Sequence, residues 1–439
     1  MQNLGIPDRS RNRTAGGIKF SARHALVTLA LALMVFDFRR ASGDGGTLPV
    51  LITVAALASM TPIFFLKPGL PKLPIMAILP AAIYLVSSIF AGLFESREAY
   101  PVIAASIPLV LFITSSIAIA SAAFYGGDHD KLLNTIIAFS VASLVWKLFF
   151  GFIYHGLSTE TVRYQIISGA MPLVFAYGVV AILTGGRRWM TFALLLPLLV
   201  VILSITRTYL LVFVMITFAA LICMPLSKIK AIAVRTTLLF VLLAGMVSIA
   251  YLVIPEFFDR WIDRFSLTSQ HGFDLTWSTR MAEAYSQYEQ MAASRMRMLF
   301  GSGPAAETYY GGVWGQQIFG LLGWDGMGGI GGYGHNFYFG ALFVGGVLFG
   351  TLFLAMILFW PLAGLRWSKR AIKSEKPHFA LLWGSTAAVG YCAYGAFGGL
   401  FIDRAMCFYF GIAFGLIFAG KLVAQRQDKS HLAFESQVA

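Results

Sequence analysis

The chain has 439 residues, of which 58% are hydrophobic and 12% are charged, whereas soluble domains carry roughly 25% charged residues. This composition excludes an ordinary soluble domain and predicts a polytopic integral membrane protein. The net charge of +13 would suggest a nucleic-acid partner for a soluble protein. Because most basic residues lie in short loops beside apolar runs, we expect membrane lipids as partners and no nucleic acid.

Apolar runs follow one another from residue 24 to residue 420, and each is near the ~20 residues that cross a bilayer. We therefore predict an all-α bundle of about 12 transmembrane helices. One long run is divided only by the polar turn Thr206-Arg207-Thr208. The predicted spans are residues 24–38, 47–66, 73–93, 101–125, 132–154, 165–184, 189–205, 208–225, 234–255, 335–362, 378–400 and 405–420.

Lysine and arginine residues set the expected orientation through the positive-inside rule. With residues 1–23 as a cytoplasmic tail, the Lys-rich loops and the tail at 421–439 all fall on the cytoplasmic side. Residues 24–255 then hold the transmembrane helices before a large loop, and residues 335–420 hold those after it. This arrangement places the loop, residues 256–334, on the periplasmic side.

The segment STRMAEAYSQYEQMAASRMRMLFGSGP, residues 278–304, lies inside this loop. Its apolar residues recur at 281, 284/285, 288, 291/292 and 298/299, which is a helical period. The pattern predicts an amphipathic helix that lies on the membrane surface or over a cavity between the spans. Ser278 or Thr279 would cap its start, and Gly301 and Gly303 would end it.

Four arginines are expected on the periplasmic side, where the positive-inside rule makes cations uncommon. A guanidinium is a planar, permanent cation that suits phosphate oxygens. Each arginine could instead contact lipid headgroups or helix-end carbonyls. For Arg207 we favour an anion, because its turn is too short to leave the membrane surface. The four are Arg163, Arg207, Arg280 and Arg404.

The stretch GGYGHNFYFG, residues 331–340, places His335 and Asn336 behind a glycine-rich leader. An imidazole is a natural general base for a hydroxyl nucleophile, although a histidine at a helix start is often only an interfacial residue. Asn336 would either cap the helix or bind a ligand. Lys147 is a cation inside a predicted span, which makes it a functional candidate unless it snorkels or pairs with an acid such as Asp37.

The sequence contains no Walker motif, and its histidines and cysteines lack the spacing of a metal site. We therefore predict no metal, no cofactor and no ATP-driven mechanism. Cys223, Cys392 and Cys407 all lie inside apolar segments, so they offer no disulfide framework.

The order of these pieces resembles the O-antigen ligase and Wzy-type polysaccharide polymerase superfamily. The resemblance implies a GT-C-like, metal-independent, inverting glycosyltransferase of the bacterial inner membrane, with its active site facing the periplasm. Its donor would be an undecaprenyl-pyrophosphate-linked oligosaccharide, and its acceptor a hydroxyl of another glycan. The matching pieces are TRT at 206–208, STR at 278–280, FGSGP at 300–304, and HN at 335–336 leading into GGVLFG at 345–350.

The same resemblance gives roles to several residues. Arg207 and Arg280 would bind the pyrophosphate and stabilise its charge as it leaves. Arg163 would match another outer arginine of the family, and His335 would activate the acceptor hydroxyl. From the residues alone, further substrate contacts are expected from three polar side chains: Arg404, Asn336 and Lys147.

Among the members of the superfamily, we favour a polymerase that joins repeat units of an exopolysaccharide, O-antigen or capsule. A chain-length regulator and export proteins are then expected as partners. One alternative is a ligase that moves the finished glycan to lipid A core or to a protein. Two others belong to different classes: a transporter or flippase of lipid-linked sugar, and a purely structural assembly partner.

Overall fold

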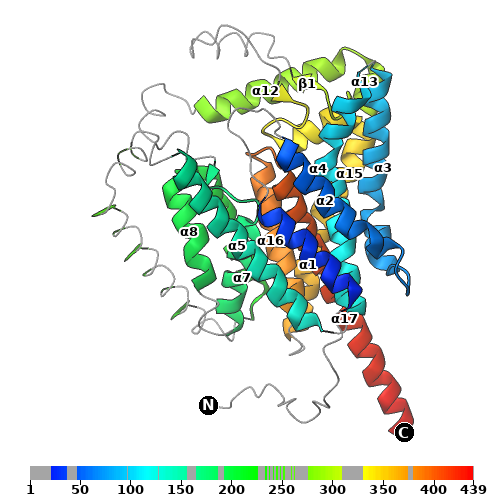
Figure 1. The fold of residues 1–439 in the computed structure, drawn as a ribbon, viewed down its shortest axis with the longest axis vertical. Coiled ribbons are helices and arrows are strands. Elements are labelled where there is room, and N and C mark those ends of the chain that lie inside the picture. Colours follow the sequence, from blue (N-terminus) through cyan, green and yellow to red (C-terminus); the bar gives the residue numbers. More distant parts are fainter. Residues whose placement is uncertain are drawn as a thin grey trace.

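The computed structural model describes residues 21–36, 47–95, 97–126, 128–155, 165–185, 192–225, 275–308, 330–373 and 379–438, with scattered positions between 233 and 262. Within these ranges the chain is almost wholly helical, and the helices form one bundle (Figure 1). Several predictions fall largely or wholly outside these ranges, including the tail at 1–23 and the suggested Lys147 partner Asp37. The span at 234–255 is described only at scattered positions, and Arg163 lies outside the described residues.

The helices of the first half follow the apolar runs of the sequence, because a run of apolar residues crosses a bilayer only with its backbone hydrogen bonds closed internally. The polar turn predicted near residue 207 does divide one long run into two helices, α8 and α9. The elements are α1 (Ala22–Val35), α2 (Thr47–Met60), η1 (Thr61–Phe64), α3 (Lys72–Phe94), α4 (Ala99–Tyr125), α5 (His129–His155), α7 (Met171–Thr184), α8 (Phe192–Ser204) and α9 (Arg207–Cys223).

From residue 275 onward, the described part of the chain contains two helices and a small strand pair before three longer helices. Figure 1 shows α12, α13 and β1 together at one end of the bundle, while α17 runs to the C-terminus at the opposite end. The elements are α12 (Leu275–Ala292), α13 (Arg295–Phe300), β1 (Glu307–Thr308), β2 (Ile330–Gly331), α15 (Phe337–Lys373), α16 (Phe379–Gly395) and α17 (Arg404–Val438). The helix predicted to end at residue 420 therefore continues as part of α17.

Six of the described helical segments are long and apolar enough to cross a membrane. Shorter apolar helices, including α1, α7 and α9, accompany them. An all-α membrane protein is thus consistent with the fold, while the total of about 12 spans and the side on which each loop lies stay predictions. The six segments are Thr47–Phe64, Lys72–Phe94, Ala99–Tyr125, His129–Ile153, Phe337–Ile372 and Arg404–Arg426.

The core of the bundle lies along α17. In this helix 89% of the apolar stretch is buried, against 33% in α2 and in α3, so α17 is central and the other two are peripheral. Some buried polar groups in the core form hydrogen bonds between helices. The Ser115 hydroxyl of α4 donates to the Phe408 carbonyl of α17 at 3.1 Å, and Trp383 Nε1 of α16 donates to the Leu173 carbonyl of α7 at 2.8 Å.

The helix α15 is interrupted at Gly346, which has φ 68° and ψ 176°. The break frees carbonyl groups of the preceding turn, and the loop after α13 supplies their donors. The N–H groups of Ser302 and Gly303 donate to the carbonyls of Phe343 and Val344 at 2.8 and 3.0 Å. A Cβ at Gly301 would lie 2.2 Å from the Val344 oxygen, so this backbone contact requires glycine.

An ion pair ties α13 to the end of α3. The Arg297 guanidinium donates Nε–H to Glu95 Oε1 at 2.8 Å and Nη2–H to Oε2 at 2.6 Å. Arg97 adds a bond from Nη1 to the Ala305 carbonyl at 2.5 Å. These contacts fix the α13 loop on the rim of the bundle, directly beside the break in α15.

This ion pair predicts a loss of stability in acid. The hydrogen bond from Arg297 lowers the pKa of Glu95 below its ordinary value, so the stabilisation is present above the ordinary glutamate pKa of about 4.3 and is lost as the pH falls through the lowered pKa. Because the pair is partly exposed, its contribution is at most about 1 kcal/mol. Thermal unfolding in detergent should show wild type losing this increment on acidification, while Glu95→Gln lacks it already at pH ~7. An identical acid dependence of the two proteins would contradict it.

Candidate functional site

The inner face of α12 carries a polar cluster. Glu283 and Gln287 are each 1% exposed, and Ser286 is buried beside them, next to the apolar side chains of Ala282, Ala284 and Met291. The outward face carries Met281 and Tyr285. The predicted helix is present as two helices, α12 and α13, and it begins at Leu275, so Ser278 and Thr279 do not cap its start.

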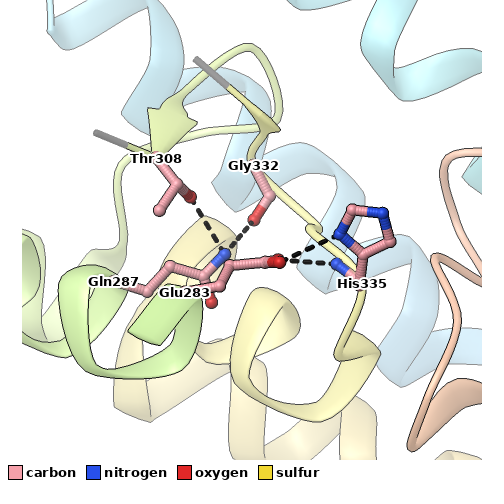
Figure 2. Close-up of polar contacts among 5 residues, drawn as sticks. All are labelled: Glu283, Gln287, Thr308, Gly332 and His335. Carbon is pink, nitrogen blue, oxygen red and sulfur yellow. Dashed lines mark hydrogen bonds and ion pairs between the residues drawn. The ribbon is translucent and has the colours of Figure 1, made fainter. Parts of the chain in front are cut away.

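The buried carboxylate of Glu283 holds His335 (Figure 2). Its Oε1 accepts the backbone N–H of His335 at 2.6 Å, and its Oε2 lies 3.0 Å from Nδ1 of the ring. The imidazole side chain is 49% exposed, whereas the carboxylate side chain is 1% exposed. Figure 2 shows the other ring nitrogen, Nε2, turned away from Glu283. The carboxylate therefore anchors one edge of the ring and leaves the other edge open.

Gln287 supports the same loop one helical turn further along α12. Its Nε2 donates to the Thr308 hydroxyl at 3.1 Å and to the Gly332 carbonyl at 3.2 Å (Figure 2). Thr308 belongs to β1, which pairs antiparallel with β2 immediately before Gly332. Both edges of the loop that carries His335 are thus fixed to α12.

Gly334 lets the backbone approach Glu283. Its φ is +54°, and a Cβ there would lie 1.6 Å from Glu283 Oε1. Gly334→Ala should therefore displace the carboxylate, reduce any activity that needs the Glu283–His335 contact, and add strain of roughly 1–3 kcal/mol. Thermal unfolding and an activity assay would measure both effects. Gly69→Ala is the matched control, because nothing lies within 4 Å of a Cβ at Gly69; equal behaviour of the two variants would refute the close approach.

Asn336 caps α15. Its Oδ1 accepts the backbone N–H groups of Tyr338 and Phe339 at 3.1 and 3.3 Å, which satisfies donors that a helix start leaves open. Of the two roles predicted for Asn336, the structure shows the cap. His335 consequently lies in the turn before the cap, and not at the first position of the helix where the predicted span began.

Arg404 begins α17 next to this turn. The Phe401 ring lies 5.0 Å from the Phe337 ring and 5.9 Å from the Tyr333 ring, measured between centroids. Phe401 lies in the loop that leads into α17. It therefore packs against residues that come shortly before and shortly after His335 in the sequence. Asp403 caps α17 by accepting the Met406 N–H at 3.0 Å, and Arg404 follows it, partly exposed.

Arg207 is the first residue of α9 and is partly exposed. Two residues further on, the Tyr209 ring lies 5.2 Å from the Tyr394 ring at the end of α16. The turn before Arg207 contains Ile205 with φ 51°, an unfavourable conformation for a β-branched residue. Packing against the end of α16 places the start of α9 near the loop that leads to Arg404.

Arg280 lies on α12, three residues before Glu283, and is partly exposed. Residues three apart are neighbours on a helix surface, so Arg280 and the anchor of His335 share one stretch of α12. Lys147 is buried in α5, and the contacts described around His335 do not include it. In the described part of the chain, no three His, Cys, Asp or Glu side chains form a group that could hold a metal ion.

The contacts of Glu283 and Gln287 with the loop of His335 were not predicted from the sequence. A weak signal was available, because these two polar residues are four apart and so share one face of the predicted helix. Together, the structure places an anchored imidazole at the end of an apolar bundle, beside the loop that leads to Arg404. Such an arrangement can accept a proton from a hydroxyl group close to an anionic ligand.

No protein-family model matches this chain, and no curated protein matches it.

Proposed function

We propose that the chain is a glycosyltransferase of the Wzy-like polysaccharide polymerase type. It joins undecaprenyl-pyrophosphate-linked oligosaccharide repeat units at the periplasmic face of the bacterial inner membrane, by metal-independent inverting transfer. The observation that carries the proposal is the Glu283–His335 pair at the end of an apolar bundle, on the same helix as Arg280. A GT-C-like architecture and partners for chain-length control and export belong to the same proposal.

The proposed reaction assigns the proton to His335. A hydroxyl oxygen of the acceptor glycan attacks the anomeric carbon of the donor, and its proton passes to His335 Nε2. The bond between the anomeric carbon and the phosphate oxygen breaks, and the pyrophosphate leaves with the electron pair. Attack opposite the leaving group inverts the anomeric centre. Pyrophosphate is already a good leaving group, so the site mainly needs orientation and positive charge.

The arginines supply that charge. Arg280 and Arg207 hold the pyrophosphate, and Arg404 extends the cationic edge toward the glycan. A permanent guanidinium suits phosphate oxygens through two parallel N–H donors. Arg163 remains a further predicted contact. Lys147 is proposed only as a remote contact, because it is buried in α5.

A polymerase and a ligase would use the same chemistry, and they differ in the acceptor. The Glu283–His335 pair favours both over a flippase, because moving a lipid-linked sugar across the membrane forms no glycosidic bond and requires no base. A purely structural partner would require neither an anchored imidazole nor nearby arginines.

Purified full-length protein in vesicles with synthetic lipid-linked repeat units tests the proposal. Wild type should lengthen the lipid-linked glycan, and Arg280→Ala or Arg207→Ala should lower the rate roughly 10- to 100-fold, since a hydrogen bond to a charged group contributes about 1.5–3 kcal/mol. Arg370→Ala, which removes an exposed arginine near the C-terminal end of α15, is the matched control.

Two further outcomes separate the alternatives. Adding lipid A core as a competing acceptor identifies a ligase if the glycan moves to it. Movement of labelled lipid-linked sugar across the vesicle without a new glycosidic bond would overturn the proposed transferase and support a flippase.

A further inference from the structure

The rim helices α12 and α13 share an exposed apolar surface, here called the rim face. Its two most solvent-exposed residues are Tyr288, which is 57% exposed, and Met296, which is 53% exposed. Single exposed apolar side chains need no explanation, but contiguous ones mark a contact surface. The rim face consists of Met281, Tyr285, Tyr288, Met296, Leu299 and Phe300.

The exposed face of α12 contains large apolar side chains, although polar side chains of the same helix are buried. A helix on the surface of a soluble protein buries its apolar stripe and exposes its polar side chains. This helix buries Glu283, Ser286 and Gln287 as well as three apolar side chains, and it exposes Met281, Tyr285 and Tyr288 beside the charged Glu289. A face that mixes large apolar, tyrosine and charged side chains suits the boundary between water and the acyl chains of a bilayer.

The rim face continues the outer surface of a helix that has membrane-spanning character. The Phe300 ring of α13 lies 6.1 Å from the Phe349 ring of α15. Next to Phe349, Val347 and Leu348 are exposed, and α15 is among the helices long and apolar enough to cross a membrane. The apolar surface thus runs from the span onto α13 without a polar interruption at this contact.

Charge at the edge of the rim face selects a lipid surface over a purely apolar partner. Arg295 is exposed at the start of α13, and the side chain of Arg297 is 39% exposed. Arginine and tyrosine at the border of an apolar surface are typical of the headgroup level of a bilayer. Lipid phosphate provides an anion for Arg295, whereas Arg297 is already paired with Glu95.

We propose that the rim face is immersed in the headgroup layer of the membrane, with Met296, Leu299 and Phe300 reaching the acyl boundary. The bilayer then fixes the depth of α12, and through Glu283 it fixes the depth of His335. The immersion itself depends only on membrane embedding. Its use in keeping the reactive nitrogen level with a lipid-linked pyrophosphate rests on the proposed function.

Spin-label accessibility tests this inference without any substrate, so its outcome is separate from that of the transferase assay. Met296→Cys, Leu299→Cys and Tyr288→Cys are labelled in the full chain, in vesicles of phosphatidylethanolamine and phosphatidylglycerol. The native cysteines are all buried and are replaced by alanine. Leu348→Cys is the lipid-facing reference, and Gly69→Cys in an open loop is the reference for water.

Immersion predicts that labels at 296 and 299 collide with oxygen several-fold more than with a water-soluble nickel complex, as at 348, and that the label at 288 is intermediate. A nickel response equal to that at Gly69→Cys would overturn the proposal, because it would place the rim face in water. Low collision rates with both reagents would also overturn it, because they would indicate a protein cover. With three separate label sites, failure of one variant to fold leaves the inference testable.

Discussion

Replacing His335 by alanine is expected to lower glycosyl transfer by about 10²- to 10⁴-fold, the range over which positioned acid–base groups act. The acceptor hydroxyl would lose the group proposed to take its proton, while the arginines proposed to hold the pyrophosphate remain. The protein should still fold, because the ring is half exposed and the backbone N–H bond to Glu283 does not need the side chain. The rate at which lipid-linked glycan lengthens in vesicles is the measurement.

Two variants control this experiment. Phe339→Ala removes an exposed side chain from the same turn of the chain and should leave the rate close to that of wild type. His335→Gln keeps a polar side chain that can bond to Glu283 but supplies no base, so it should be as slow as His335→Ala. Full activity in His335→Gln would exclude proton transfer to this residue and leave it a binding role only.

Replacing Glu283 by glutamine is expected to remove most of the contribution of His335. The carboxylate can only accept hydrogen bonds, so it requires the proton of the neutral ring on Nδ1 and leaves Nε2 as the acceptor. A glutamine amide can donate to Nδ1, which favours the opposite tautomer with a proton on Nε2. The fall in rate should then approach the ~10²- to 10⁴-fold range of the base itself.

A double-mutant cycle distinguishes this positioning role from a general structural defect. If Glu283 acts through His335, Glu283→Gln should cause no further loss in a protein that already carries His335→Ala. Gln287→Ala is the matched control on the same helix. It removes a hydrogen bond to the loop but leaves the Glu283 carboxylate in place, so it reports the effect of weaker loop support alone. Additive losses in the double variant would show that Glu283 acts independently of the imidazole.

The position of most helices could be predicted from the sequence because a membrane helix is specified by a local property, the length of an apolar run. The turn at Arg207 is the clearest example, since a single polar tripeptide separates α8 from α9. The capping role of Asn336 is equally local. The glycine-rich leader made His335 a candidate, and its role stays a prediction; its place in the turn before the helix was not predicted.

The inward face of α12 could not be predicted in the same way. Its period was visible, but which side is buried depends on segments distant in the chain. Glu283 contacts a residue 52 positions away, and Gln287 contacts one 45 positions away. A buried carboxylate is costly unless it is paired, so an acid inside an amphipathic pattern is read as solvated until its partner is known. The break in α15 at Gly346 is hidden for a similar reason, because its freed carbonyls are satisfied from the α13 loop.

The interruption of α15 at Gly346, which is held by the loop after α13, limits which substitutions this part of the chain can accept. Backbone N–H and carbonyl groups make the contact between residues 302–303 and 343–344, so the identities of most side chains there do not affect it. What the contact demands is the absence of a side chain, at Gly301 and at Gly346. Relatives of this chain are therefore free to exchange apolar residues around the break, and we expect the glycines at these two positions to vary less than the residues between them.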